Sequence, residues 1–82
     1  MHYPVLFEKI TAPEFPDGYY YAHIPSLGLT THGLGIEGAR AAAVDLARLW
    51  ITEKHVHGEI VPAPAECLLG TLEISTDALQ SA

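Results

Sequence analysis

The sequence IEGARAAAVDLARLWITEK, residues 36–54, has the pattern of one long amphipathic α-helix. At 3.6 residues per turn, its apolar residues fall within an arc of about 100°. The apolar side comprises Ile36, Ala39, Ala43, Leu46, Ala47 and Trp50. The opposite side, which we expect to face water, comprises Glu37, Ala41, Asp45, Arg48 and Thr52. Because alanines let a helix approach a flat surface closely, we predict that this helix lies on one face of a small antiparallel sheet.

The segments before the helix predict that sheet. Residues 3–10 (YPVLFEKI) and 18–24 (GYYYAHI) are rich in aromatic and β-branched residues, and the loop between them ends in Asp-Gly, a turn signal. We expect these two segments to form a hairpin. Residues 29–32 predict a short third strand, and a glycine turn follows in which Gly35 caps the helix.

The segment after the helix predicts a fourth strand. Residues 68–75 (LLGTLEIS) alternate in polarity and follow a connection that Pro62 and Pro64 keep extended. This strand could complete its own sheet or pair with another chain. Residues 76–82 are expected to form a frayed tail or a short final turn. The predicted fold class is therefore α+β: a three-stranded antiparallel sheet covered by one long helix, plus a C-terminal fourth strand, in the order β-β-β-α-β.

Composition indicates one small globular domain. The chain has 82 residues, 49% of them hydrophobic, which suffices for a core but for one of marginal size. The longest apolar runs are far shorter than the roughly 20 residues that span a bilayer, and the N-terminus lacks the features of a signal peptide. The single cysteine, Cys67, cannot form an internal disulfide. These features predict a cytoplasmic protein with no membrane association.

The charge balance favours a basic protein as partner. Ten acidic residues stand against four basic ones, which gives a formal net charge of -6. The basic residues are scattered as Lys9, Arg40, Arg48 and Lys54, and they form no stripe that could neutralise phosphates. We therefore expect no direct binding of nucleic acid. An acidic surface is suited to a basic protein.

Catalytic, metal and cofactor sites are not predicted. A two-metal nuclease needs several converging carboxylates, whereas Glu8, Asp17 and Glu37 are separate in the pattern and are expected to be solvated surface charges. His55 and His57 are two residues apart, but no second ligand pair of recognised spacing accompanies them. Cys67 lies in an apolar stretch and is expected to be a small buried or interfacial residue. We predict no enzyme activity, no metal and no cofactor.

Three consecutive tyrosines are the most informative feature of the predicted second strand. Tyr19 and Tyr21 share one face of a strand, and Tyr20 lies on the other. Such rings can stack on bases, but the missing basic groove disfavours that role. A protein-binding surface, for a different protein or an identical subunit, and simple packing within the sheet both stay open.

Several short motifs resemble a known family in their order and spacing. They are Ala22-His23-Ile24-Pro25 leading to Leu27-Gly28, Thr31-His32-Gly33, the pair Glu37 and Ala39, and Gly58 followed by Ile60, Pro62 and Pro64. Together they resemble the HicB-type antitoxin family over residues 3–75. The chain differs from the usual pattern in its loop after Pro25, which is one residue shorter, and at Gly38, where an acidic residue is common.

The resemblance implies a partial, degraded ribonuclease-H-like fold without enzymatic activity. Members of this family bind a small basic HicA-like ribonuclease toxin and block its active site. The expected contacts here are Tyr19, Tyr21, His23 and Glu37. Many members carry an additional C-terminal DNA-binding module, whereas we expect one HicB-like domain over residues 1–82 and no separate DNA-binding domain.

Two other functions stay open at this stage. The first is a stand-alone oligomeric HicB-like module, a structural or regulatory adaptor without a toxin, in which a homodimer or homotetramer uses the free strand edge. The second is a degenerate nuclease that binds metal at Glu8, Asp17 or Glu37. The antitoxin-type function is the hypothesis that the sequence favours.

Overall fold

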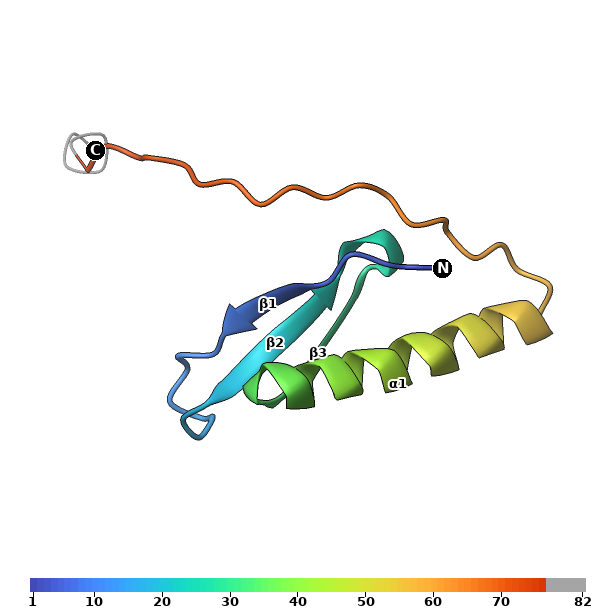
Figure 1. The fold of residues 1–82 in the computed structure, drawn as a ribbon, viewed down its shortest axis with the longest axis horizontal. Helices are drawn as coiled ribbons and strands as arrows, with labels where there is room; N and C mark the ends of the chain where they lie inside the picture. The colour runs from blue at the N-terminus through green and yellow to red at the C-terminus, as the bar shows by residue number, and fades with distance from the viewer. Residues whose placement is uncertain (77–82) are drawn as a thin grey trace.

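The computed structural model describes residues 1–76, which form one antiparallel sheet and one long helix (Figure 1). The elements are β1 (Leu6–Lys9), β2 (Tyr19–Ile24), a one-turn 3₁₀ helix η1 (Pro25–Leu27), β3 (Leu29–Leu34) and α1 (Gly35–Val56). The strands lie in the order β1-β2-β3, each antiparallel to its neighbour. The prediction of an α+β fold with three strands and one helix is confirmed. Of the predicted C-terminal segment 76–82, residues 77–82 lie outside the described residues.

The predicted hairpin forms, although β1 is shorter than residues 3–10. Pro4 has no N–H to donate to a ladder, and the strand begins only at Leu6. At the other end, β3 continues to Leu34 rather than stopping at His32. Between β2 and β3, Gly28 adopts a left-handed φ of 66° and its N–H bonds to the carbonyl of Pro25 at 3.2 Å, which closes the η1 turn.

Small residues bring α1 close to the sheet. Ala22 on β2 and Ala39 on α1 are both fully buried. A Cβ built on Gly33 would lie 2.4 Å from the carbonyl carbon of Gly38, so β3 and the first turns of α1 meet backbone to backbone. The predicted apolar side of the helix is correct except at Ile36, which is 47% exposed. Ile36 lies in the first turn, where the helix has only begun to cross the sheet.

The hydrophobic core is small. Its five members are Ala22, Ile24, Leu27, Ala39 and Ala43, with larger side chains packed around them at partial burial. Among the described residues no large side chain is completely buried. The helix lies against β3 and β2 and makes much less contact with β1. The side of the sheet that faces the helix is therefore only partly covered at β1.

The predicted fourth strand is not formed within the described residues. Residues 68–75 are extended, but the sheet has three strands and this segment is not one of them. Two contacts hold the chain just before it: Tyr3 Oη donates to the carbonyl of Pro62 at 2.7 Å, and Ala65 N–H donates to Ser26 Oγ at 3.1 Å. Beyond this point the segment runs in the same direction as β1 and then away from the body (Figure 1).

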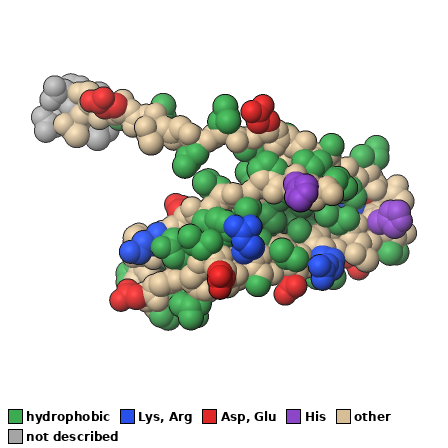
Figure 2. Space-filling model, viewed as in Figure 1, with side chains coloured by type: hydrophobic (Ala, Val, Ile, Leu, Met, Phe, Trp, Pro, Cys, Tyr) green, Lys and Arg blue, Asp and Glu red, His purple; other side chains and the backbone are tan. Residues whose placement is uncertain are grey.

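The shape of the molecule reflects this projecting segment. The Cα radius of gyration is 16.4 Å, against about 12 Å for a compact chain of this length. Figure 2 shows the segment extending from a body that carries many apolar side chains on the visible side. Separately, no helix in the part of the chain that the structure describes is long and apolar enough to cross a membrane.

Candidate functional site

The face of the sheet opposite α1 is open to water. Strand register places three rows of side chains across it: Leu6, His23 and Thr30; Glu8, Tyr21 and His32; and Tyr19 with Leu34. We call these eight residues, together with Phe15 from the β1–β2 loop, the open face. Because side chains alternate along a strand, Tyr20, Ala22 and Ile24 point to the other side, where they contact the core.

Aromatic rings and imidazoles interlock on the open face. The Phe15 ring lies 6.1 Å from Tyr19, 6.0 Å from Tyr21 and 5.1 Å from His32 between centroids. Its contacts with Tyr21 and His32 are edge-to-face, the arrangement that aromatic pairs prefer. Tyr21 in turn lies 5.7 Å from His23. The rings therefore restrain one another while each remains at least partly exposed to solvent.

A chain of polar side chains crosses the same face. Nε2 of His23 lies 2.9 Å from Glu8 Oε1, and Nδ1 lies 2.9 Å from Thr30 Oγ1. With Nε2 protonated toward the carboxylate, a neutral His23 accepts a hydrogen bond from the Thr30 hydroxyl; a charged His23 donates to it instead. In either state both ring nitrogens are bonded, so the plane of the imidazole is fixed.

The order carboxylate, imidazole, hydroxyl also occurs in hydrolases, where the hydroxyl attacks a substrate. Such chemistry depends on stabilising a developing anion in a site that excludes water. Here Glu8 and Thr30 are exposed, and the Glu8 side chain is 62% accessible. We therefore interpret the hydrogen bonds of Glu8 and Thr30 to His23 as contacts that orient the imidazole on a binding surface. The absence of enzyme activity stays a prediction.

Three of the four predicted contact residues come together. Tyr19, Tyr21 and His23 are consecutive open-face positions of β2. Glu37 is not among them, because it lies in the first turn of α1, on the other side of the sheet. The sequence reasoning missed Phe15 and Thr30, expected Glu8 to be a separate surface charge, and named His32 only as part of a motif. Alternation along β3 was the signal that could have placed Thr30 and His32 on one face.

The groups considered as metal or nucleophilic sites are dispersed. Within residues 1–76, no cluster of three or more histidine, cysteine, aspartate or glutamate side chains is placed to hold a metal ion. Of the histidine pair near the end of α1, His57 uses Nδ1 to bond the Glu53 carbonyl at 2.8 Å. Cys67 is exposed rather than buried. It lies in the extended segment, which does not pack into the core of this chain.

The electrostatic character of the open face is neutral to acidic. Its nine residues, all within the described part of the chain, include Glu8 and no lysine or arginine. The basic side chains lie elsewhere; Lys54, for example, pairs with Glu59 at 2.9 Å near the end of α1. A phosphate backbone would therefore meet no lysine or arginine among these nine residues.

Comparisons with known proteins add no relative. The chain matches no protein-family model, no curated protein and no solved structure.

Proposed function

We propose that this chain is a HicB-like, antitoxin-type protein that binds a small basic ribonuclease toxin and blocks it sterically. The open face is the proposed binding surface, with Tyr19, Tyr21 and His23 as central contacts. Glu37 lies outside that surface. The protein would act in the cytoplasm, where a ribonuclease reaches its RNA, and would need no cofactor.

The observation that carries the proposal is a preorganised aromatic surface left uncovered by the fold. Tyrosines are enriched in the centres of protein interfaces, because they bury much area at a low cost in conformational entropy. The ring contacts of Phe15 with Tyr19, Tyr21 and His32 lower that cost further, since the side chains are already ordered.

Charge supports a basic partner over other classes. The formal net charge of the chain is -6, and the nine residues of the open face include Glu8 and no lysine or arginine. Opposite charge accelerates the encounter of two proteins, and this acceleration falls as salt screens it. The association rate with the toxin should therefore decrease as salt is raised. Variants that have lost acidic residues should associate more slowly, and their association rate should depend less on salt.

We further propose that this fold is related to the ribonuclease-H-like fold. The three strands and α1 would correspond to a partial ribonuclease-H-like fold, in which residues 68–75 supply the fourth strand once the protein assembles. The motifs from Ala22 to Gly33 and from Gly58 to Pro64 support this relation through their resemblance to the HicB-type family.

The experiment is a pull-down of the tagged full chain from a lysate of its source organism, followed by mass spectrometry. We expect a small basic ribonuclease in stoichiometric amount. Tyr21→Ala should lose it, since truncation of a central interface tyrosine typically weakens binding by about tenfold or more. Leu49→Ala is the matched control, because Leu49 is an exposed apolar residue of α1 on the other side of the sheet.

A contrary result is equally definite. If the ribonuclease is captured equally by the wild type and the Tyr21→Ala variant, the open face is not its binding surface. If the protein recovers only itself, the antitoxin-type function is wrong. The second candidate then applies, a stand-alone oligomeric module that serves as a structural or regulatory adaptor. The exposed apolar residues of the extended segment are the observation that favours this second candidate.

A further inference from the structure

The extended C-terminal segment carries an apolar surface that the rest of the described chain, residues 1–76, leaves exposed. We call residues 66–75 the arm. Its large apolar side chains, Leu68, Leu69, Leu72 and Ile74, are all exposed, and Leu72 is 89% accessible. In a strand, Leu68, Leu72 and Ile74 point to one face, whereas Leu69, Thr71 and Glu73 point to the other. The arm therefore has the side-chain pattern of a strand without the sheet to which it belongs.

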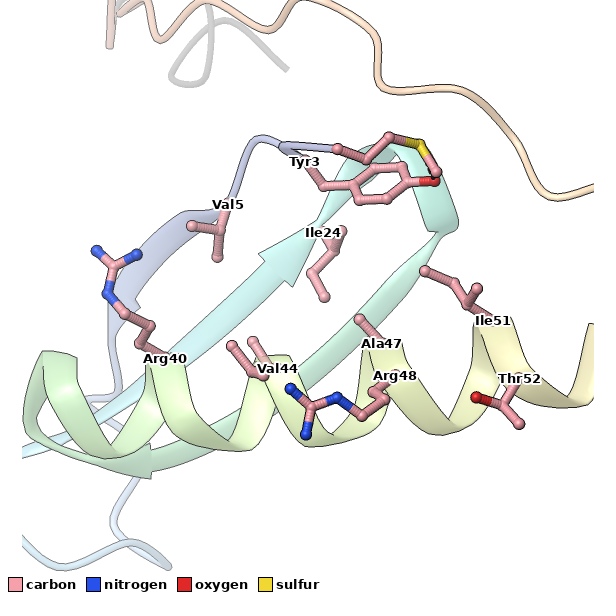
Figure 3. Close-up of a pocket in the computed structure, with 11 residues that line it drawn as sticks. Tyr3, Val5, Ile24, Arg40, Val44, Ala47, Arg48, Ile51 and Thr52 are labelled. Atoms are coloured by element: carbon pink, nitrogen blue, oxygen red, sulfur yellow. Dashed lines mark hydrogen bonds between the residues drawn. The ribbon is translucent and has the colours of Figure 1, made fainter.

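A groove of about 440 Å³ lies between α1 and the N-terminal segment that leads into β1 (Figure 3). Its floor is formed by apolar side chains from the N-terminal segment, β2 and α1; among them are Val5, Ile24, Val44, Ala47 and Ile51. Beside it, β1 is an edge strand of the sheet. One side of its backbone is therefore open to another strand, which is an arrangement that proteins normally cover.

The charges of groove and arm are complementary. Arg40 and Arg48 lie along the groove, one on each side of Val44 (Figure 3). Among the described residues neither arginine has an acidic partner within ion-pair distance, and Arg40 instead lies over the Phe7 ring at 5.1 Å. The arm carries no basic residue, and Glu66 lies on the same face of the arm as Leu68, Leu72 and Ile74. An acidic, apolar strand is the occupant that this groove fits.

The arm of the same chain is directed away from the groove. The contacts of Pro62 with Tyr3 and of Ala65 with Ser26 fix the chain at the end of the sheet. From there the arm leaves the body, so that the longest dimension of the molecule reaches 53 Å. Cys67, Leu68 and Leu69 pass the start of β1, where they line a second pocket with Pro4 and Leu6. An outstretched arm beside an unoccupied edge is the geometry of an exchange between two identical chains.

We propose that the protein forms a two-fold dimer in which each arm lies along β1 of the other chain, with Leu68, Leu72 and Ile74 covering the partner's groove. The arm adds a fourth strand to the partner's sheet and covers its open edge. The two grooves are filled reciprocally, so that one arm and one groove from each chain make two equivalent contacts. This dimer leaves the open face free, and the proposal does not depend on the antitoxin-type function.

The first experiment compares aspartate substitutions at two adjacent arm positions of the 82-residue chain. Light scattering and sedimentation over a range of concentrations should give the wild type a mass of about twice the 8.9 kDa of one chain. Leu72→Asp should raise the dimer dissociation constant by roughly a hundredfold or more, because two copies of a buried leucine are lost. Thr71→Asp places the same charge on the other face of the arm and should leave the dimer intact.

A second pair of variants tests the groove. Val44 lines it and is 47% exposed, whereas Leu49 is 63% exposed on another side of α1. Val44→Asp should therefore give monomers, and Leu49→Asp should remain dimeric. Circular dichroism should show native helix content for both variants, since neither side chain belongs to the buried core of one chain.

Mixing the two disruptive variants distinguishes exchange from other modes of association. The Leu72→Asp variant has an unaltered groove, and the Val44→Asp variant has an unaltered arm. In their mixture the unaltered arm can bind the unaltered groove, which restores one of the two contacts. We expect a heterodimer at concentrations at which neither variant associates alone. A monomeric wild type would overturn the proposal, whether its arm folds back onto its own groove or its groove binds another protein. Equal effects of Leu72→Asp and Thr71→Asp, or a mixture that stays monomeric, would also overturn it.

Discussion

The contact between Gly33 and Gly38 gives a stability prediction in which two similar substitutions have opposite signs. Gly33→Ala places a Cβ 2.4 to 2.6 Å from the backbone of Gly38 and Ala39, which no side-chain rotation can relieve. For Gly38→Ala the nearest atom is the carbonyl carbon of Gly33 at 3.5 Å, an ordinary contact. The two glycines face each other, but only the position of Gly33 requires the absence of a side chain.

The expected magnitudes follow from this geometry. Forcing β3 and α1 apart should lower the free energy of unfolding by about 1–3 kcal/mol, although replacing glycine by alanine in a strand ordinarily stabilises by about 0.5–1 kcal/mol. Gly38→Ala should raise the free energy of unfolding by roughly 0.8–1 kcal/mol, the intrinsic preference of alanine over glycine within a helix.

Urea unfolding monitored by circular dichroism at a fixed protein concentration measures these effects. With a slope of about 1 kcal/mol per molar urea, Gly33→Ala should lower the midpoint by roughly 1–3 M, and Gly38→Ala should raise it by about 1 M. If Gly33→Ala is neutral or stabilising, the close approach of α1 to β3 is wrong. The same conclusion follows if both substitutions shift the midpoint in one direction.

Three further variants test other contacts. Leu27→Ala removes one of the few buried core side chains and should cost about 2–5 kcal/mol in the free energy of unfolding, measured by the same titration; a loss below 1 kcal/mol would contradict this burial. Tyr3→Phe removes the hydrogen bond to Pro62 and should accelerate amide exchange in residues 59–67 by roughly two- to tenfold; unchanged exchange would mean that this bond does not anchor the segment. Glu8→Gln alters an exposed pair with His23 and should change the free energy of unfolding by less than about 1 kcal/mol; a larger loss would give the polar chain a structural role.

The helix and the hairpin could be predicted because their signals are local. The apolar period of residues 36–54 and the Asp-Gly turn before β2 depend on neighbouring residues alone. The fourth strand could not be predicted in the same way, because its pairing depends on residues far away in the sequence or in another chain. Alternation in residues 68–75 shows that the segment can pair, but it does not specify which edge it pairs with or in which chain. In the described residues the segment remains outside the sheet.

The candidate site was predictable where it depended on alternation and not where it depended on register. Alternation alone placed Tyr19 and Tyr21 on one face, whereas His23 was expected as a contact only through the family resemblance. The position of Thr30 and His32 beside them depends on how β2 pairs with β3 through the η1 turn, and alternation within one strand does not give that register. Phe15 belongs to a loop whose path the sequence does not define. The position of Glu37 depended on which face of the sheet α1 covers.

The most direct measurement is a titration of the captured ribonuclease with this protein, read as cleavage of RNA. The wild type and the Leu49→Ala control should both abolish cleavage near one equivalent of chain. The Tyr21→Ala variant should need about tenfold more protein or greater for the same inhibition. If Tyr21→Ala inhibits as well as the wild type does, or if the wild type leaves cleavage unchanged at excess, the open face does not neutralise a ribonuclease.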